Sequence, residues 1–342
     1  VEGTTYEADH IILATGARPR ELPFLPADGE HVITSREALT LGRLPESLVV
    51  VGSGAIGSEF AWFYATLGVR VTVVEYLPRM LPLEDEEVSK AMERSFRKLR
   101  AAVLTSTTVK GVRITPEGMC EVEIEGRKGP ETLVAEKVLS AVGIQANIEG
   151  IGLEEVTVDP YYRTSVPGIY AIGDIVPGPA LAHVASAEGI CCVEAICGLN
   201  PDPVDYTTVP SCVFTQPEVA SVGMTEQEAR ERGIEYKVGR FPFTASGKAT
   251  AAGDRDGFVK LRRRRAPARR APRGRIGHGD ARRTDAGPAS GRDGPPDSTH
   301  DPCPPDDERR DHGGGRSGPR RGDTPIKMPR VKGKGRAPDL PF

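Results

Sequence analysis

The sequence predicts an α/β fold, and three observations lead to it. Residues 47–75 run through a β-branched stretch, a glycine-rich turn, an apolar helix and a second β-branched stretch, which together predict a strand–helix–strand unit. A short apolar run at 6–16 ends in Gly16, and a further strand is predicted at 169–172, directly before Gly173. Strands that alternate with helices in this way are typical of parallel sheets.

The elements of the first half follow from local patterns. The run at 6–16 predicts a buried strand that leads into a tight turn. Residues 84–99 predict a solvent-facing crossover helix, because acidic side chains fill its first turn and basic ones its end, as the helix dipole favours. Alternating polar and apolar stretches at 109–140 predict a small antiparallel layer, which ends in a return strand at 137–142.

The second half begins with a helix predicted at 182–197, after the strand at 169–172. From residue 207 the pattern changes to short strands around one helix at 226–232, whose start fits a capping box of Thr225 and Glu228. The last clear strand is 257–261. This part predicts the beginning of a separate α+β domain.

The composition changes sharply near residue 261. Residues 1–260 carry 24 Lys and Arg against 37 Asp and Glu, whereas residues 261–342 carry 21 against 11. The last 82 residues hold 18 Arg, 13 Gly and 13 Pro, and Phe342 is their only aromatic residue, so they bury too little apolar surface to offset the entropy of ordering. We therefore predict a disordered basic tail at 262–342.

Two hypotheses explain this tail. An abrupt change to Arg, Gly and Pro is what a GC-rich coding strand yields when it is translated out of frame, which would place a frameshift near codon 261. Alternatively, the tail is a basic arm that binds nucleic acid through phosphate contacts. We favour the first hypothesis and expect no nucleic-acid partner, because the tail lacks interleaved aromatic residues and RGG repeats.

The sequence also predicts where the protein is located and which kinds of site it lacks. No apolar run approaches the roughly 20 residues that a membrane helix needs, and the chain opens without a signal-peptide core, which predicts a soluble cytoplasmic protein with no membrane partner. The six cysteines follow no disulfide spacing, and we assign no metal site. The start at Val1, just before a strand pattern, indicates a fragment with sequence missing upstream.

The strongest chemical motif is Gly52-Ser53-Gly54-Ala55-Ile56-Gly57, which lies between a strand and a helix. The first glycine permits the tight turn, the second lets the backbone approach a pyrophosphate, and the third lets the helix pack on the strand. The helix N-terminus supplies N–H groups and a positive dipole. Glu75 ends the next strand, where it can accept hydrogen bonds from ribose hydroxyls and would repel a 2′-phosphate. The motif therefore predicts NAD rather than NADP, against the alternative of an ordinary strand-to-helix turn.

A second carboxylate, Asp174, follows the strand at 169–172. Open α/β sheets bind ligands beyond the carboxyl ends of their strands, so Asp174 is placed to bond a ligand hydroxyl. A capping aspartate at a turn explains the same pattern equally well. Thr15 and Gly16 follow the strand at 6–16 in a similar but weaker motif.

Five motifs occur in a fixed order: ILATGARP, VVVGSGAIGSEFA with VTVVE, SAVGIQAN, RTSVPGIYAIGDIVPGPALAHVASAEG and FTQPEVASVGMTE. In this order they resemble the pyridine nucleotide–disulfide oxidoreductases and, within them, the dihydrolipoamide dehydrogenases. The resemblance implies two nucleotide-binding, Rossmann-like domains, one for FAD and one for NAD. It divides the chain into a partial FAD domain, an inserted NAD domain, an FAD return segment, a partial dimerisation domain and the tail: 1–24, 25–145, 146–204, 205–261 and 262–342.

The resemblance also implies the cofactor contacts. The NAD contacts that it implies are Gly52, Ser53, Gly54, Ala55, Ile56, Gly57, Ser58, Glu59, Glu75, Val109 and Gly143. The FAD contacts that it implies are Thr15, Gly16, Asp174, Ala180, Leu181, Ala182 and His183. Glu59 resembles a family glutamate that pairs with a lysine beside the flavin, and we interpret His183 as a packing or supporting residue rather than a catalytic base.

The family's reaction passes electrons between NAD, FAD and a redox disulfide that oxidises dihydrolipoyl groups of 2-oxo acid dehydrogenase complexes, and its members are homodimers. The redox cysteine pair and the C-terminal histidine–glutamate pair of the family have no counterpart in this sequence, so we assign no catalytic residue; His300 and Glu308 are not given that role. Two alternatives stay open: an inactive NAD-binding remnant, and another flavoprotein disulfide reductase that acts on glutathione or mercuric ion.

Two further features depart from the family pattern. Cys192 and Cys197 have the spacing of a redox pair, but five helical steps turn their side chains about 140° apart, so we interpret both as buried core residues. Residues 155–159 run on where the family has about ten more residues, which predicts a shortened surface loop.

Overall fold

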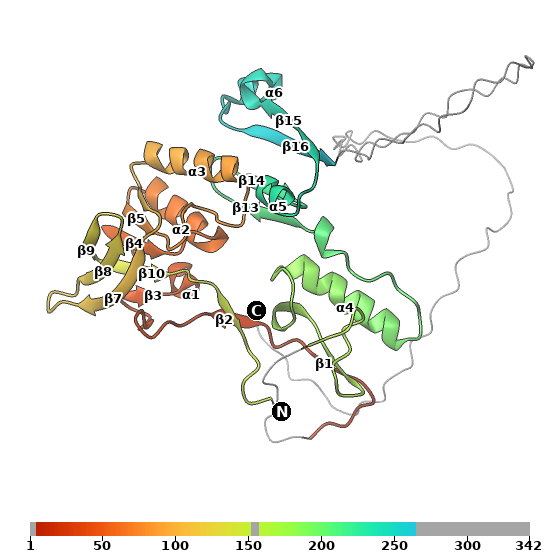
Figure 1. Cartoon of the computed structure of the whole chain (residues 1–342). Coiled ribbons are helices and arrows are strands. Elements are labelled where there is room, and N and C mark those ends of the chain that lie inside the picture. Colours follow the sequence, from red (N-terminus) through yellow and green to blue (C-terminus); the bar gives the residue numbers. More distant parts are fainter. Residues whose placement is uncertain (1–4, 152–156, 265–342) are drawn as a thin grey trace, which may run out of the picture. The chain divides into compact units, whose positions relative to one another are not determined.

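A parallel sheet of five strands organises the first half of the chain, as the sequence predicts (Figure 1). The computed structural model describes residues 5–151 and 157–264. The strand order is β3-β10-β4-β5-β6, and every neighbouring pair is parallel. The strands of this sheet are β3 (Val32–Ile33), β4 (Ser47–Val51), β5 (Arg70–Val74), β6 (Ala102–Leu104) and β10 (Lys137–Ser140).

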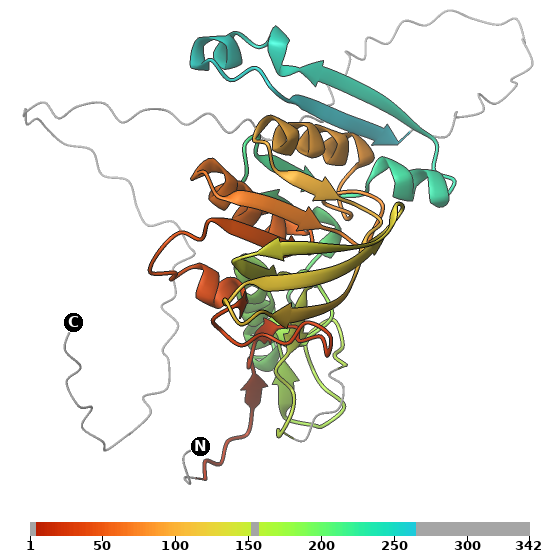
Figure 2. The same ribbon diagram turned by 90° about the vertical axis from the view of Figure 1, so that its left-hand side faces the viewer.

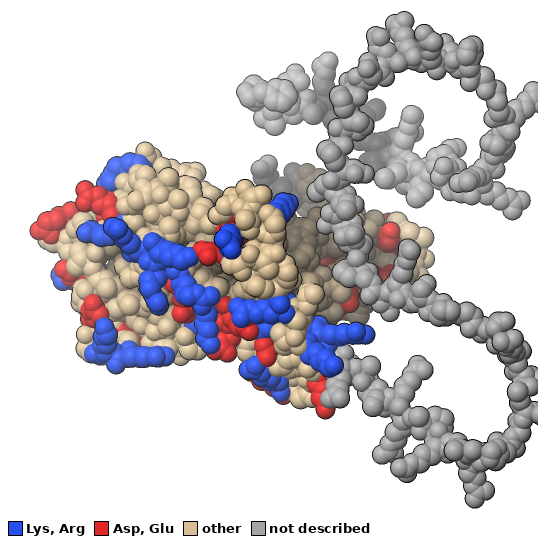
Figure 3. Space-filling view, turned by 90° about the horizontal axis from the view of Figure 1, so that it is seen from above, with Lys and Arg blue, Asp and Glu red and all other residues tan. Residues whose placement is uncertain are grey.

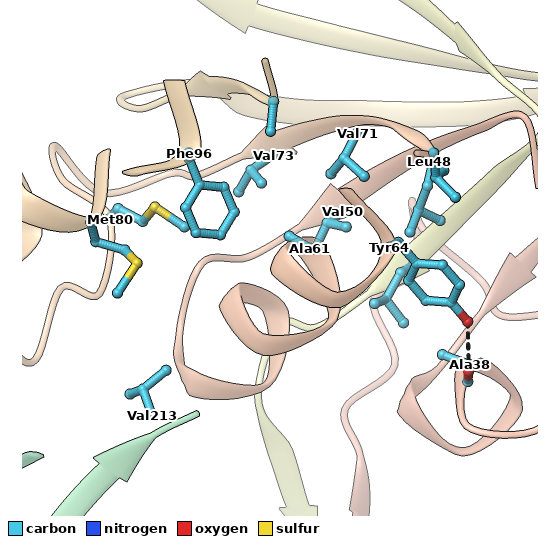
Figure 4. Close-up of a cluster of buried hydrophobic side chains, with 14 of the residues drawn as sticks. Ala38, Leu48, Val50, Ala61, Tyr64, Val71, Val73, Met80, Phe96 and Val213 are labelled. Atoms are coloured by element: carbon cyan, nitrogen blue, oxygen red, sulfur yellow. Dashed lines mark hydrogen bonds between the residues drawn. The ribbon is translucent and has the colours of Figure 1, made fainter. Parts of the chain in front are cut away.

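Helices cover one face of this sheet. They are α1 (Ser35–Ala38), α2 (Ala55–Thr66) and α3 (Glu86–Lys98). The strand β4 is buried along its whole length, and its alternate residues face opposite sides: Leu48 and Val50 pack with Phe96 of α3 and Tyr64 of α2 (Figure 4). The Tyr64 hydroxyl donates a 2.6 Å hydrogen bond to the Ala38 carbonyl, which satisfies its polar end inside this core.

A three-stranded antiparallel sheet covers the other face of the parallel sheet (Figure 2, yellow). Its strands are β7 (Thr108–Ile114), β8 (Cys120–Gly126) and β9 (Gly129–Ala135). Val49 and Val51 of β4 pack against Val122 and Ile124 of β8. A parallel sheet covered on both faces needs continuously apolar strands, which is why residues 47–51 read SLVVV.

The predicted crossover helix is confirmed as α3, with one correction. Asp85 caps its N-terminus by accepting a hydrogen bond from the Glu87 amide, and basic residues occupy its last turn. The helix is not solvent-facing throughout, however, because Met92 and Phe96 are fully buried against the parallel sheet. Its charged residues form a single outer stripe, which is the pattern of an amphipathic helix.

The strand predicted at 6–16 is much shorter and more open than expected. It is β1 (Ile11–Leu13), which pairs in parallel with β12 (Ile169–Ala171). Ile11 and Ile12 are 44% and 37% exposed, so the prediction of a buried strand is wrong. Among the described residues β12 is the only neighbour of β1, and a strand in a two-stranded ribbon has no sheet around it to bury its faces. A second small ribbon pairs β2 (Ala17–Pro19) with β11 (Ile144–Ala146).

The second half follows the predicted order. After the short helix η1 (Gly173–Ile175) comes α4 (Ala182–Ile196), and η2 (Tyr206–Thr208) leads into the antiparallel pair β13 (Pro210–Val213) and β14 (Val219–Val222). The helix α5 (Glu226–Glu231) begins with the predicted capping box. Last come β15 (Tyr236–Pro242), η3 (Phe243–Ala245), α6 (Gly247–Ala252) and β16 (Phe258–Arg264).

The final strand runs beyond its predicted end at residue 261. Arg262 pairs with Val238 of β15, and its guanidinium lies 3.1 Å from the Asp85 carboxylate of the α3 cap. Residues 262–264 are therefore part of the α+β segment and not of the predicted tail. The rest of that tail, with His300 and Glu308, and residues 152–156 of the predicted shortened loop lie outside the described residues.

A cluster of charged residues lies where β16 meets α3 and α5. The Lys260 ammonium is 2.8 Å from Asp85, 3.2 Å from Glu87 and 2.5 Å from Glu226, and the lysine side chain is only 6% exposed. Burial alone would lower the pKa of Lys260, but the bonds to these carboxylates outweigh it and raise the pKa to about 12. We call these four residues and Arg262 the ion cluster.

Candidate functional site

The glycine-rich turn between β4 and α2 has the geometry that its motif predicts. Gly52 has a φ of +97°, and a Cβ atom there would lie 2.3 Å from the Ala141 carbonyl oxygen. A Cβ at Gly57 would lie 2.0 Å from the Gly52 carbonyl oxygen. The first and third glycines are therefore required by the backbone itself, the first for the turn and the third for the contact of helix and strand.

The second glycine, Gly54, has a different role. Its backbone is extended, and no atom lies within 4 Å of the place a Cβ would occupy. No side chain caps the N-terminus of α2, and Ala55 and Ile56 in its first turn are exposed. The loop thus leaves an open surface over the uncapped N–H groups of a helix, which is an environment that favours a phosphate group.

Glu75 lies beside this loop, directly after β5, and is 6% exposed. Its Oε2 accepts hydrogen bonds of 2.7 Å from both the amide and the hydroxyl of Ser53. Its Oε1 accepts one of 2.8 Å from the Leu77 amide. The structure therefore brings the predicted carboxylate and the predicted glycine loop into direct contact across 22 positions of sequence.

The other predicted NAD residues differ in their solvent exposure. Gly143 is exposed between β10 and β11. Ser53 and Ser58 have no exposed surface and Val109 is 5% exposed within the core, so Ser53 and Ser58 offer no surface for the direct NAD contact predicted for them. Glu59 is half-buried and accepts a 2.8 Å hydrogen bond from the Phe214 amide of the α+β segment.

Two of the predicted flavin residues follow the strands of the β1–β12 ribbon. Because these two strands are parallel, Thr15 after β1 and Asp174 after β12 follow the same end of the ribbon. The Thr15 hydroxyl donates a 2.6 Å hydrogen bond to the Asn147 carbonyl, and Asp174 is half-buried in η1. The sheet topology therefore brings these two predicted residues together.

Ala180, Leu181, Ala182 and His183 lie at the start of α4. Leu181 caps this helix without a side-chain hydrogen bond, so the first N–H groups of the helix have no side-chain partner at the cap. His183 is exposed and does not pack in the core of this chain, because the buried face of the helix begins at Val184. Its predicted supporting role stays a prediction.

A buried carboxylate supports the Asp174 turn, and no local sequence pattern predicts it. Glu188 of α4 is 1% exposed and accepts 2.6 Å hydrogen bonds from the Gly173 amide and the Tyr206 hydroxyl. Burial and the bond to Glu188 raise the pKa of Tyr206 well above its usual range. The Tyr206 ring also lies close to Gly178, where a Cβ atom would be 3.3 Å from it.

The two cysteines with redox-like spacing are not a pair. Cys192 is fully buried, whereas Cys197 is exposed at the C-cap of α4, so the interpretation as core residues is right for Cys192 and wrong for Cys197. Five helical steps place the two side chains on different faces of α4. Both are free thiols.

The described residues show no sign of two further kinds of site. No group of three or more His, Cys, Asp or Glu side chains there could hold a metal ion. No helix in the same ranges is long and apolar enough to cross a membrane. Acidic and basic side chains are interspersed over the face seen in Figure 3.

The chain matches two protein-family models. Residues 1–189 match the pyridine nucleotide-disulphide oxidoreductase model, and residues 209–267 match the dimerisation domain of the same class. The second match passes residue 261, as β16 does.

Curated relatives and solved structures agree with these matches. The chain is 50% identical over 264 residues to dihydrolipoyl dehydrogenase from Chlorobaculum tepidum, which covers 74% of the chain and 56% of that relative. It is 47% identical over 266 residues to the Bacillus subtilis enzyme of the same name, covering 73% of the chain and 55% of the relative. The chain thus spans little more than half the length of the curated relatives it matches.

Among solved structures, LpdA from Mycobacterium tuberculosis is similar with a TM-score of 0.70 and 34% identity, over 76% of this chain and 58% of that one. The flavoprotein disulfide reductase RclA from Escherichia coli is similar with a TM-score of 0.66 and 26% identity, over 75% and 60%.

Proposed function

Because the chain belongs to the pyridine nucleotide-disulphide oxidoreductase family, we propose that it provides the NAD site and part of the FAD site of a dihydrolipoyl dehydrogenase. The single observation that carries the proposal is the contact of Glu75 with the glycine loop at the N-terminus of α2. The loop supplies N–H groups for a pyrophosphate, and the carboxylate beside it supplies an acceptor for ribose.

NAD fits the residues present. Gly54 leaves open space where a larger residue would place a side chain, and the uncapped helix start favours an anion. A 2′-phosphate on the ribose would bring a second negative charge to Glu75, which disfavours NADP. When bound, the nicotinamide ring supplies hydride transfer; this chain's residues bind and orient the dinucleotide.

FAD also fits, with a smaller set of residues. Asp174 would accept a hydrogen bond from the ribityl chain, and Glu188 would hold the Gly173 amide so that the turn keeps its shape. The start of α4, residues 180–183, would approach the flavin through its backbone groups. Bound FAD supplies the electron relay between nicotinamide and thiols.

The substrate, partner and assembly state belong to the same proposal. Identities of 47% to 50% to dihydrolipoyl dehydrogenases favour dihydrolipoyl groups of 2-oxo acid dehydrogenase complexes as the thiol substrate and partner. The match to a dimerisation domain favours a homodimer. RclA supports the alternative of another flavoprotein disulfide reductase, but at 26% identity it carries less weight.

The test is a fluorescence titration of the 342-residue chain with NADH and with NADPH. We expect NADH to bind more tightly by at least tenfold, and Glu75→Ala to reduce this preference several-fold, because a hydrogen bond to a charged group contributes about 1.5–3 kcal/mol. Glu131→Ala, which removes an exposed glutamate of β9, is the matched control and should change neither affinity. If NADPH binds the unmutated chain as tightly as NADH, the assignment of Glu75 is wrong.

A further inference from the structure

Ser53, the second residue of the glycine-rich motif, is completely enclosed by its neighbours. It has no exposed surface, although it lies in a loop. Its amide and hydroxyl both donate to Oε2 of Glu75. Its carbonyl oxygen accepts 3.0 Å hydrogen bonds from the Ser58 hydroxyl and the Leu81 amide. Every polar group of Ser53 therefore has a partner within the protein, and none faces a dinucleotide.

These bonds also determine which oxygen of Glu75 a ligand can use. A carboxylate oxygen offers about two lone pairs. Ser53 occupies both on Oε2, while the Leu77 amide occupies one on Oε1. One acceptor position on Oε1 remains, so the carboxylate is anchored at one oxygen and free to accept at the other.

We propose that Ser53 is a positioning residue for nucleotide selection. Its hydroxyl anchors one oxygen of Glu75, so that the other oxygen is presented to a ribose hydroxyl. The anchored carboxylate also cannot rotate away from a 2′-phosphate, which it therefore repels. The inference rests on the proposed NAD site and adds a residue that acts on selectivity without touching the nucleotide. The competing interpretation is that Ser53 is a small residue that only fills space in the turn.

The test compares the ratio of NADPH to NADH dissociation constants for the full chain and its variants. Ser53→Ala removes the anchoring hydroxyl and should lower this ratio about fivefold, through weaker NADH binding and stronger NADPH binding. Ser53→Cys keeps the size and has a weaker donor, so its ratio should lie between the two. Ser47→Ala is the matched control, because Ser47 is also buried and its hydroxyl accepts a 3.0 Å hydrogen bond from the Glu136 amide, at the end of β4 opposite to the glycine loop. It should leave the ratio unchanged.

A double-mutant comparison tests whether Ser53 acts through Glu75. Adding Ser53→Ala to Glu75→Ala should not lower the ratio further, because the group that Ser53 positions is already absent. Unfolding midpoints measured in parallel identify variants that fail to fold; if Ser53→Ala is one of them, Ser53→Cys carries the same comparison.

Each outcome decides one question. A fall in ratio that vanishes in the Glu75→Ala background supports the inference. An unchanged ratio in both Ser53 variants, or an equal further fall in the Glu75→Ala background, overturns it and favours the space-filling role. An unmutated chain without NADH preference instead refutes the proposed function, independently of the Ser53 result.

Discussion

Replacing Lys260 with methionine should destabilise the chain by about 3 kcal/mol. The substitution keeps the length of the side chain but leaves Asp85, Glu87 and Glu226 facing one another without the cation between them. Removing one partner of a buried ion pair costs about 3–5 kcal/mol. The lower end applies here, because Glu87 is 37% exposed and Arg262 remains beside Asp85.

The pKa shift of Lys260 gives a similar free energy of stabilisation. The cluster raises the pKa of Lys260 from 10.5 to about 12, and a rise of this size corresponds to about 2 kcal/mol. Because the pKa is raised on folding, this contribution is complete below pH 10.5 and is lost as the pH rises through about 12.

Urea unfolding followed by circular dichroism measures the effect. With a typical slope of about 2 kcal/mol per molar urea, the midpoint of Lys260→Met should fall by about 1–2 M. Lys237→Met is the matched control, because it removes an exposed lysine from β15 of the same ribbon and should shift the midpoint little. Equal midpoints for the two variants would show that the ion cluster contributes nothing and that the reasoning is wrong.

At acidic pH the stability of the chain should depend on pH in the opposite direction. Bonds from Lys260 lower the pKa of Glu226, and at Asp85 the bonds from Lys260 and two backbone amides outweigh burial and lower the pKa as well. A carboxylate whose pKa is lowered on folding stabilises the protein above its unfolded pKa and loses this contribution as the pH falls. The urea concentration at the unfolding midpoint of the unmutated chain should therefore decrease when the pH is lowered below about 4.5. The midpoint of Lys260→Met should decrease less over the same pH range. Parallel acid profiles for the two proteins would contradict this.

Three further predictions concern backbone and core. Gly57→Ala should abolish NADH binding and lower the unfolding midpoint, since its Cβ would lie 2.0 Å from the Gly52 carbonyl oxygen; a stable variant that binds NADH would contradict the geometry. A chain that ends at Leu261 should unfold at lower urea than one that ends at Arg264, because only the longer one completes β16; identical midpoints would place the strand end at 261. Phe96→Ala should cost about 3–5 kcal/mol in the free energy of unfolding through the cavity it leaves, and a loss below 1 kcal/mol would show that the core there collapses.

Features encoded by neighbouring residues were predictable from the sequence. The glycine turn, α4 and the capping box of α5 depend on residue types within one or two turns of chain. The same kind of signal marks α1, where Thr34 and Glu37 form a capping box, but this helix was missed because it has only four residues. The burial of β1 was predicted wrongly, because burial depends on which strands stand beside it and not on its own apolar residues.

The site was predictable to the same extent. Gly52 and Gly57 follow from backbone geometry, whereas Gly54 and Glu75 follow from the spacing of the motif. Other contacts could not be predicted, because they join residues from different segments: Lys260 meets Asp85 across 175 residues, and Tyr206 meets Glu188 of α4. No local pattern specifies such pairs.

The contact of Tyr206 with Gly178 constrains how this protein can diverge. A methyl group at position 178 would lie 3.3 Å from the tyrosine ring, which would then have to shift by a few tenths of an ångström while keeping its hydrogen bond to Glu188. Gly178 also has a φ of +156°, a backbone conformation that residues with a side chain rarely adopt, so a smaller residue at 206 would not by itself make an alanine at 178 compatible with this turn. We expect homologues to keep glycine at 178 even where position 206 differs, because the backbone conformation requires it independently of the tyrosine.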